Sequence, residues 1–359
     1  MAVPLFDTSG PLAPLREELR AAVARVLDSQ QYILGPEVEA FEREFAAYCG
    51  VAHAVGVANG TEAITIALRA LGVGPGDEVV VPSFTFYASA EAIPPTGATP
   101  VFCDIDPDTY CVTAATVRAA LTPRTKAVIA VHLFGNVAPV ADIQALGVPV
   151  LEDAAQAAGS TSEAGRPGAL GAAATFSFFP SKNLGGFGDG GAITTDDPEV
   201  AQRARVLRFH GSRDKVEYQL VGYNSRLDEL QAAVLRVQLG HLDSWADARR
   251  RAGAAYERAG LEEGGVALPV PVAGCRPAWH LYVVGHPDVR QLEAALAAAQ
   301  IGHKAYYRTP VHRQEAMRPW GAGVELPATE HAARTHLAIP MSATLSDAQV
   351  AKVVAAIRA

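Results

Sequence analysis

Cysteine is scarce in this sequence. The 359 residues include four, Cys49, Cys103, Cys111 and Cys275, and none of them forms a CxxC pair. Zinc and iron–sulfur sites need ligands at short, recurrent spacings, so we predict no metal site. The opening residues, MAVPLFDTSG, lack the charged and apolar regions of a signal peptide. We therefore expect a cytoplasmic protein with reduced thiols.

Long hydrophobic runs and clusters of positive charge are also missing. No apolar stretch approaches the roughly 20 residues that cross a bilayer, so we expect no membrane partner. The chain has 30 Lys and Arg against 38 Asp and Glu, a net charge of −8, and its basic residues are scattered. Nucleic acid is therefore not an expected partner. No GxGxxG or Walker motif precedes a helix, which argues against a simple nucleotide-binding module.

The sequence does have short hydrophobic runs that alternate with helical patterns. Hydrophobic residues make up 49% of the chain. Seven runs are predicted as strands, at 54–57, 78–82, 99–104, 127–132, 148–153, 174–179 and 191–195. Helices are predicted between them at 61–71, 84–94 and 114–121. Strands that are apolar on both faces and alternate with helices predict an α/β fold with a largely parallel sheet. In such sheets the ligand lies beyond the carboxyl ends of the strands.

The length of the chain allows two domains. We predict a large domain over residues 1–240, with N-terminal helices at 14–30 and 36–48, and a smaller one over 241–359. A helix from Asp197 to about 209 and one long helical stretch over 227–257 precede the smaller domain. In that domain we expect a strand at 280–284, a helix at 289–299, and a last helix opened by a capping box of Ser346 and Gln349.

The stretch 174–195, ATFSFFPSKNLGGFGDGGAITT, contains the most reactive candidate side chain. Lys182 follows a buried strand and stands in a glycine-rich turn. Burial disfavours the ammonium form, so a free amine becomes available to form a Schiff base with an aldehyde cofactor such as pyridoxal phosphate. The alternative is a surface loop with an ordinary solvated lysine.

Three further sites fit the same cofactor. Gly60 and Thr61 stand at a strand–turn–helix junction whose free amides suit a phosphate, and Ser177 stands near the end of its strand. The alternatives are a plain helix cap and a hydroxyl bonded to local backbone. Asp153 ends the strand 148–153, where a carboxylate can pair with a pyridine nitrogen, and Gln156 follows on the same side. The alternative for Asp153 is again a helix cap.

Aromatic and amide side chains supply two more candidates. In the segment PSFTFY, one ring can stack on a cofactor, and at least two of the three rings are expected to pack in the core. Asn224, ahead of the long helical stretch, is either a helix cap or a ligand.

Together these motifs resemble one family. ANGTEA, PSFTF, VLEDAAQAAG, TFSFFPSKN with GGFGDGG, and YNSRLDELQAA are similar, in order and spacing, to the motifs of the DegT/DnrJ/EryC1/StrS sugar aminotransferases. The resemblance extends over nearly the whole chain. It implies a fold-type I enzyme that binds pyridoxal 5'-phosphate, with the seven-stranded sheet in the large domain and a smaller α+β domain.

The resemblance also implies residue roles. Lys182 matches the lysine that binds the cofactor, Asp153 the residue on the pyridine nitrogen, and Gln156 its neighbour near the ring oxygen. Phe86 matches the stacking aromatic of the PSFTF motif. The phosphate-binding positions match at Gly60, Thr61 and Ser177. Asn224 matches an asparagine that reaches the cofactor of the partner subunit, which implies a homodimer with shared active sites.

For the substrates, the resemblance implies glutamate as amino donor and a nucleotide-linked keto sugar as acceptor. The segments QYILGP (31–36) and VHLFGN (131–136) look closer to the 3-keto than to the 4-keto enzymes. Tyr307 and His312 stand in a segment, YYRTPVH, similar to a substrate loop of the family, which is usually spelled with a YP pair. Their alternatives are a packed aromatic and a surface histidine.

Other readings stay open at this point. A related sugar dehydratase would carry histidine in place of Lys182, so the lysine argues against it. An aminotransferase of a cyclitol or another keto substrate shares the scaffold. A regulator that binds pyridoxal phosphate without transaminase activity is the alternative from a different class.

Overall fold

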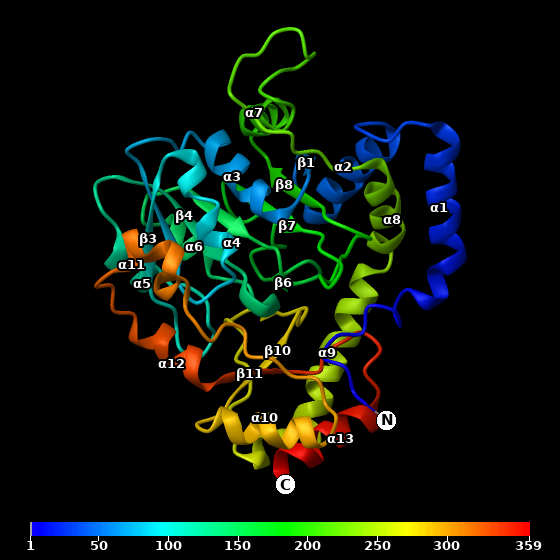
Figure 1. The fold of residues 1–359 in the computed structure, drawn as a ribbon, viewed down its shortest axis with the longest axis vertical. Helices are drawn as coiled ribbons and strands as arrows, with labels where there is room; N and C mark the ends of the chain where they lie inside the picture. Colours follow the sequence, from blue (N-terminus) through cyan, green and yellow to red (C-terminus); the bar gives the residue numbers. More distant parts are fainter. Residues whose placement is uncertain (1) are drawn as a thin grey trace.

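The computed structural model describes residues 2–359 and is built around a seven-stranded sheet (Figure 1). The strands lie in the order β1-β8-β7-β5-β4-β2-β3. Their bounds are β1 His53–Val57, β2 Glu78–Pro82, β3 Thr99–Cys103, β4 Thr125–Val131, β5 Val150–Asp153, β7 Ala173–Ser177 and β8 Gly191–Thr195. β8 is antiparallel to its neighbours β1 and β7, and the other neighbouring pairs are parallel. The predicted α/β class and mostly parallel sheet are confirmed.

Both faces of this sheet are buried, because alternate residues of each strand enter different cores. In β2, Val79 and Val81 belong to one core and Val80 belongs to another. The first core is completed by helices α3 (Gly60–Ala70) and α7 (Pro198–Arg208). The helices of the opposite face are α2 Pro36–Cys49, α5 Ala114–Ala120, α6 Val140–Gln144 and α8 Glu229–Leu239. Burial on both faces explains why these strands read as continuous apolar runs.

A second assembly of elements lies at the end of the molecule that carries both termini (Figure 1). Its strands β10 (Tyr282–Gly285) and β11 (His336–Ile339) form an antiparallel pair. The helices whose side chains share its core are α9 Leu242–Arg258, α10 Val289–Ala298 and α13 Asp347–Arg358. The remaining elements are α1 Arg16–Ser29, α4 Ala88–Glu91, α11 Arg318–Gly321, α12 Pro327–Thr335, β6 Thr161–Ser162, β9 Cys275–Arg276 and the short 3-10 helices Ala13–Leu15, Pro94–Thr96, Leu133–Gly135, Leu261–Gly264, Val311–Arg313 and Glu315–Met317.

Two predicted helix caps are present in the structure, and two predicted helices are shorter than expected. Asp197 accepts hydrogen bonds from the first turn of α7, and Ser346 forms a capping box with Gln349, as predicted. The predicted long helix over 227–257 is wrong in one respect, since it is two helices separated by Gly240 and His241. Gly253 lies inside α9, so a glycine by itself does not decide where the helix ends. The helix predicted over 84–94 is reduced to α4 and a 3-10 turn, because Pro94 and Pro95 cannot continue an α-helix.

Glu229 joins α8 to the N-terminus of α2. Its carboxylate accepts hydrogen bonds from the backbone amides of Gly35, Glu37 and Val38, each at 2.8 Å. These amides belong to the first turn of α2, whose N–H groups have no partner within the helix. The cap residue Gly35 has no side chain to satisfy them, so a buried carboxylate from a distant helix does so.

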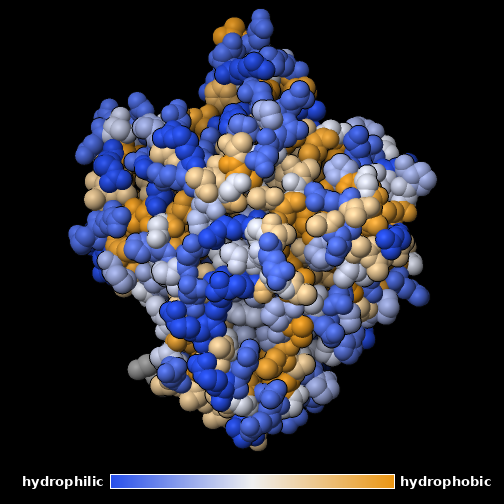
Figure 2. All heavy atoms as spheres, turned by 180° about the vertical axis from the view of Figure 1, so that it is seen from behind, coloured by the Kyte–Doolittle hydropathy of each residue, from blue (hydrophilic) through white to orange (hydrophobic). Residues whose placement is uncertain are grey.

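A polar loop over 210–222 projects from the body of the molecule beyond α7 (Figures 1 and 2). Several of its apolar side chains are exposed, among them Val216 and Val221 at 78% and 84%. Figure 2 shows hydrophobic residues on this otherwise hydrophilic projection.

Within residues 2–359 no helix combines the length and the apolar character that a membrane span requires.

Candidate active site

A cavity of about 600 Å³ lies at the carboxyl ends of the parallel strands. Its lining includes the last residues of β4, β5 and β7, the first turn of α3, and the segment 304–309. Most of the predicted site residues meet here: Gly60, Thr61, Phe86, Asp153, Gln156, Ser177, Lys182 and Tyr307. The structure thus brings these predicted site residues together at the edge of the sheet where α/β folds bind their ligands.

Lys182 lies in the turn after β7, with its backbone amide donating to the Phe179 carbonyl at 2.8 Å. Its side chain is partly buried and lines the cavity. Burial lowers the pKa of the Lys182 amine from 10.5 to about 8, against the influence of the Asp153 carboxylate, which raises it. A larger fraction of this amine is therefore uncharged near neutral pH than for an ordinary lysine.

Asp153 ends β5 and is 5% exposed. One of its oxygens, Oδ2, accepts from the Ser89 hydroxyl at 2.7 Å, and the other accepts from the Ala155 amide at 3.2 Å. The residues after it form a turn rather than a helix, so the helix-cap alternative does not apply. Thr85 lies 2.9 Å from the Ser89 hydroxyl and extends the network. These bonds hold the carboxylate in one orientation at the cavity wall.

Gln156 connects two segments of the cavity wall. Its Oε1 accepts from the Phe134 amide at 2.7 Å, and its Nε2 donates to the Tyr307 hydroxyl at 3.1 Å. Burial raises the pKa of the Tyr307 phenol, so the hydroxyl stays protonated at physiological pH. Tyr307 is therefore more than a packed aromatic, because its hydroxyl accepts a hydrogen bond from Gln156, a residue of the predicted site.

The first turn of α3 and the end of β7 form a close cradle. A Cβ atom on Gly60 would lie 2.7 Å from the Cβ atom of Ser177, so no side chain fits at this position. Asn59 caps the helix by accepting from the Glu62 amide at 2.8 Å. The earlier amides, of Gly60 and Thr61, have no acceptor within the helix and stand where the dipole favours an anion. The cradle therefore fits a phosphate group.

The three rings of the PSFTFY segment divide as predicted. Phe84 is fully buried and Tyr87 packs against the same core. Phe86 is 53% exposed and lines the cavity, where its ring centroid lies 6.0 Å from that of Tyr307. An exposed ring at a cavity wall is free to stack on a planar ligand.

Two predicted site residues do not line this cavity. Asn224 is exposed and forms an isolated bridge with Phe209 near the base of the projecting loop. His312 is buried, and its Nδ1 lies 2.6 Å from the Ser83 hydroxyl, which also accepts from the His312 amide at 2.9 Å. His312 thus lies in the interior rather than on the surface.

His280 is a residue of the cavity wall that the motifs do not indicate. It is 4% exposed, its Nδ1 has no hydrogen-bond partner in the described chain, and its ring stacks on Phe6 at 5.9 Å. Burial and the positive charges of Lys182 and Arg249 lower its pKa well below the ordinary value, so the imidazole is neutral. The only signal in the sequence is its place at the start of a predicted strand. Phe6 and Lys304 also line the cavity and come from segments without a recognisable motif, and Arg308 lines it from the YYRTPVH segment, where it was not singled out.

Comparison with known proteins decides the family. The model of the DegT/DnrJ/EryC1/StrS aminotransferase family matches residues 14–358. The chain belongs to this family. A Streptomyces venezuelae dTDP-3-amino-3,4,6-trideoxy-alpha-D-glucose transaminase is 47% identical over 365 residues, covering 99% of this chain and 95% of the relative. A Geobacillus stearothermophilus "pleiotropic regulatory protein" is 44% identical over 356 residues, covering 97% and 96%.

The crystal structure of S. venezuelae DesV in complex with a ketimine intermediate has the same fold. It superposes with a TM-score of 0.96 at 45% identity, covering 99% of this chain and 98% of that one. Further relatives are named for enzymes that form other 3-amino sugars. The DegT/DnrJ/EryC1/StrS membership, the aminotransferase class and pyridoxal phosphate as cofactor are confirmed predictions. Among residues 2–359, no group of three or more His, Cys, Asp or Glu side chains is arranged to hold a metal.

Proposed function

We propose that this aminotransferase moves an amino group from glutamate to a nucleotide-linked keto sugar in amino-deoxysugar biosynthesis. The observation that carries the proposal is that the Lys182 amine, with its lowered pKa, shares one cavity with the fixed Asp153 carboxylate. When bound, the cofactor supplies an aldehyde that links covalently to amines and a ring that withdraws electrons from the attached carbon.

The residues of the cavity fit this cofactor. The Gly60–Thr61 turn and the Ser177 hydroxyl would hold its phosphate, and Phe86 would stack on its ring. Asp153, already fixed by Ser89, would hold the pyridine nitrogen in its protonated form by opposite charge. Gln156 would lie near the ring oxygen, at a position kept by its bonds to Phe134 and Tyr307.

Lys182 has two tasks in this arrangement. Its Nζ atom would hold the cofactor, and as a free amine it would take a proton from the donor α-carbon. An amine with a pKa of about 8 is suited to both roles, since proton transfer is most efficient when the pKa lies near the operating pH. Asp153 would contribute indirectly, because a pyridine nitrogen kept protonated by its carboxylate lets the cofactor ring accept the negative charge that develops during proton removal.

For the acceptor we propose a 3-keto rather than a 4-keto hexose. The support is the likeness of segments 31–36 and 131–136 to the 3-keto enzymes, together with relatives named for 3-amino sugars. Residues of the second segment lie near the site, since Val131 lines the cavity and the Phe134 amide bonds to Gln156. Tyr307 is the proposed substrate contact, and His312 would act only through Ser83.

We further propose a homodimer in which Asn224 serves the partner's cavity. Asn224 is exposed, lies outside the cavity of its own chain, and adjoins a projecting loop with exposed apolar side chains. These features fit a segment that becomes covered by a second copy. A cytoplasmic location remains part of the proposal, and the four unpaired thiols are in keeping with it.

The test is to load the protein with pyridoxal phosphate, add glutamate and a panel of nucleotide-linked 3-keto and 4-keto hexoses, and identify products by mass and stereochemistry. We expect an amino sugar from a 3-keto substrate, and no product with Lys182→Ala. Turnover by that variant would contradict the assignment of Lys182. Reaction only with a free cyclitol or another keto compound would show that the acceptor is that compound and not a nucleotide-linked sugar.

A second candidate is a regulator that binds the cofactor without transferring amino groups. One observation favours it, the 44% identity to a protein named as a pleiotropic regulator. Such a regulator would bind pyridoxal phosphate and show its absorbance band, yet glutamate would leave that band unchanged.

A further inference from the structure

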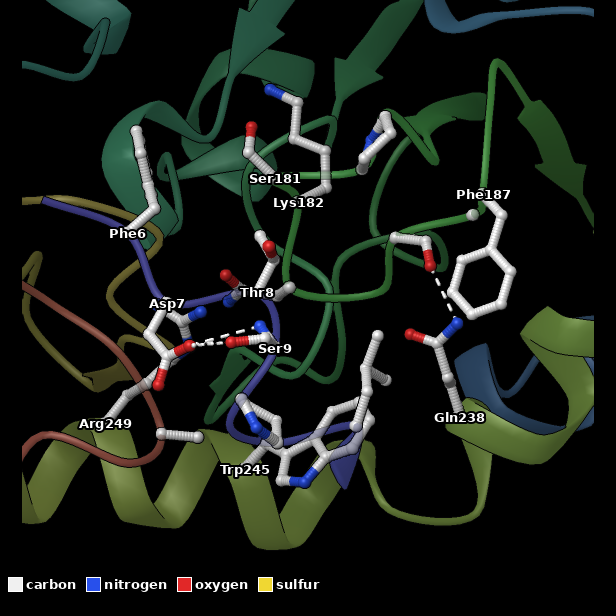
Figure 3. Close-up of a pocket in the computed structure, with 17 residues that line it drawn as sticks. Phe6, Asp7, Thr8, Ser9, Ser181, Lys182, Phe187, Gln238, Trp245 and Arg249 are labelled. Carbon is white, nitrogen blue, oxygen red and sulfur yellow. Dashed lines mark hydrogen bonds between the residues drawn. The ribbon is translucent and has the colours of Figure 1, made fainter. Parts of the chain in front are cut away.

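A second cavity, of about 460 Å³, adjoins the first (Figure 3). Phe6, Ser181 and Lys182 line both cavities, so the residue that carries the reactive amine borders each of them. In Figure 3, Lys182 lies on one side, and Trp245 and Arg249, from helix α9, lie on the other. A molecule in this space would therefore lie against both Lys182 and Arg249.

Arg249 is a buried cation without a counter-ion. It is 8% exposed, and its guanidinium donates one hydrogen bond, from Nη1 to the Trp279 carbonyl at 3.1 Å. Burial lowers its pKa to about 10, and no neighbouring charge of the described chain opposes that shift. An arginine has five N–H donors and stays charged in proteins, so most of its donors lack a partner here. Buried charges are ordinarily paired, and an unpaired one is costly.

Asp7 is the one carboxylate that lines the second cavity within residues 2–359, and it is already bound elsewhere. One oxygen accepts from the Ser9 amide and hydroxyl at 3.1 and 3.0 Å and from the Gly10 amide at 2.8 Å. The other accepts from the Thr344 hydroxyl at 2.6 Å. Asp7 therefore fixes the N-terminal segment at the cavity wall, and the described chain supplies no counter-ion for Arg249.

We propose that Arg249 binds a carboxylate of the amino donor, and that the second cavity is the donor's subsite beside Lys182. The proposal rests on the proposed aminotransferase function. A guanidinium presents a planar fork that matches a carboxylate through two parallel hydrogen bonds. The first cavity has to hold the cofactor and the keto sugar, whereas an amino acid is small enough for the second. Arg249 would thus act in the donor step and contribute nothing to the sugar step.

The first experiment separates the two half-reactions in Arg249→Met, with Arg251→Met as matched control because Arg251 is exposed on the same helix. The spectral change of the holoenzyme with glutamate reports donor binding. We expect the glutamate concentration for half-maximal rate to rise about 10- to 100-fold in Arg249→Met, as for loss of a charge-assisted bidentate pair. The rate of the second half-reaction, in which the aminated cofactor form passes its amino group to the keto sugar, should stay within about twofold of wild type in Arg249→Met. Both half-reactions of Arg251→Met should also stay within about twofold.

Alanine as donor distinguishes the two carboxylates of glutamate. If Arg249 binds the side-chain carboxylate, the variant loses activity with glutamate but not with alanine. If Arg249 binds the carboxylate on the α-carbon, the variant loses activity with glutamate and with alanine to the same extent. Equal loss in the glutamate and keto-sugar steps, or no loss in either, would overturn the proposal.

A second readout needs no turnover. Calorimetric titration of the cofactor-free protein with glutarate should give binding that Arg249→Met weakens about 10-fold or more and Arg251→Met leaves unchanged. Inorganic phosphate also has the cradle at Gly60, Thr61 and Ser177, so only phosphate binding that Arg249→Met weakens reports on the second cavity. Phosphate that binds there more tightly than glutarate would overturn the choice of a carboxylate. This measurement also separates the carboxylate subsite from the proposed aminotransferase function. If glutarate binds at Arg249 but the wild type reacts with no amino donor, the proposed function is wrong and the subsite stands.

The stability of the ligand-free variant provides the last check. Removal of an unpaired buried charge should leave the unfolding midpoint of Arg249→Met unchanged or higher. A midpoint lowered by several degrees would identify Arg249 as a structural residue instead. Should the Met variant fail to fold, Arg249→Lys keeps the charge without the fork, and a glutamate response identical to wild type would then count against the proposal.

Discussion

The chemistry of Lys182 depends on where its amine lies. Burial lowers its pKa to about 8 in the folded protein, while the unfolded chain retains the ordinary 10.5. Between these values the unfolded state binds more protons than the folded state, so the contribution of this group to stability rises with pH over that window and is unfavourable below it. The fold therefore gives up some stability at neutral pH in order to keep an amine that is partly uncharged.

This leads to a prediction for the cofactor-free protein. The rate at which Lys182 captures pyridoxal phosphate should increase with pH around a midpoint near 8 and then level off, because only the free amine reacts. Stopped-flow absorbance between pH 6 and 10.5, a range chosen to span both pKa values, measures this profile. Lys182→Ala supplies the background from surface lysines, and a midpoint near 10 would show that the amine is not desolvated.

Gly60 gives a second prediction at the scale of one residue. Gly60→Ala would place a Cβ atom 2.7 Å from the Ser177 Cβ, so helix α3 and strand β7 have to separate. Overpacking of this kind costs about 1–3 kcal/mol, and we expect the affinity for pyridoxal phosphate to fall about tenfold or more. Gly74→Ala is the matched control, since its Cβ meets nothing within 4 Å. Partial recovery in Gly60→Ala/Ser177→Gly would show that the clash, rather than the helix itself, is responsible.

At the scale of elements, the α2–α8 junction can be tested through Glu229. Glu229→Ala removes the acceptor of three amides at the start of α2, and we expect a loss of about 3 kcal/mol or more in the free energy of unfolding. Chemical denaturation of the cofactor-free protein measures it. Glu229→Gln keeps one acceptor oxygen, so its free energy of unfolding should lie between those of the wild type and Glu229→Ala. Glu39 is exposed on α2, so Glu39→Ala should change the free energy of unfolding little. Similar stability of the two alanine variants would show that the capping carboxylate is dispensable.

Elements with a strong local signal were the ones that the sequence could predict. β2 and β8 were predicted with their observed bounds because both are apolar on both faces and end at a clear break. Strand β11 and helix α12 were not predicted, since the first is four residues long and the second has no side-chain cap. The split at Gly240 depends on how α8 and α9 pack against different partners, which local propensity does not contain.

The same distinction holds for the site. Lys182, Asp153 and Gly60 stand next to strand ends in recognisable turns, so the pattern indicated them. His280 and Arg249 reach their cavities through tertiary packing, the first from the segment just ahead of β10 and the second from the middle of α9. No periodicity or spacing in the sequence distinguishes them from other buried polar residues.

For the whole molecule, the predicted boundary near residue 240 remains a proposal. The α8–α9 junction is in keeping with it, because α8 contacts α1 and α2, whereas α9 contacts α13. The division is not clean along the chain, however. Val3 belongs to the core of the β10–β11 assembly, and Leu281 and Val283 belong to a core of the large sheet.

The proposed dimer gives a prediction that only a two-chain site can meet. Lys182→Ala and Asn224→Ala, each inactive or weak alone, are mixed, unfolded and refolded together. If Asn224 serves the partner's cavity, half of the dimers are hybrids with one intact site, so about a quarter of wild-type activity should return. Refolding each variant alone is the control. No recovery in the mixture, with hybrids verified by mass spectrometry, would mean that Asn224 does not act across the interface.

The carboxylate of Glu229 also has a consequence for how the chain is made. The amides that it caps leave the ribosome more than 190 residues before it does. During synthesis the first turn of α2 must therefore wait for most of the sheet to be translated before its polar groups find their final acceptor. A nascent chain that stalls ahead of position 229 would present that turn uncapped to chaperones and proteases.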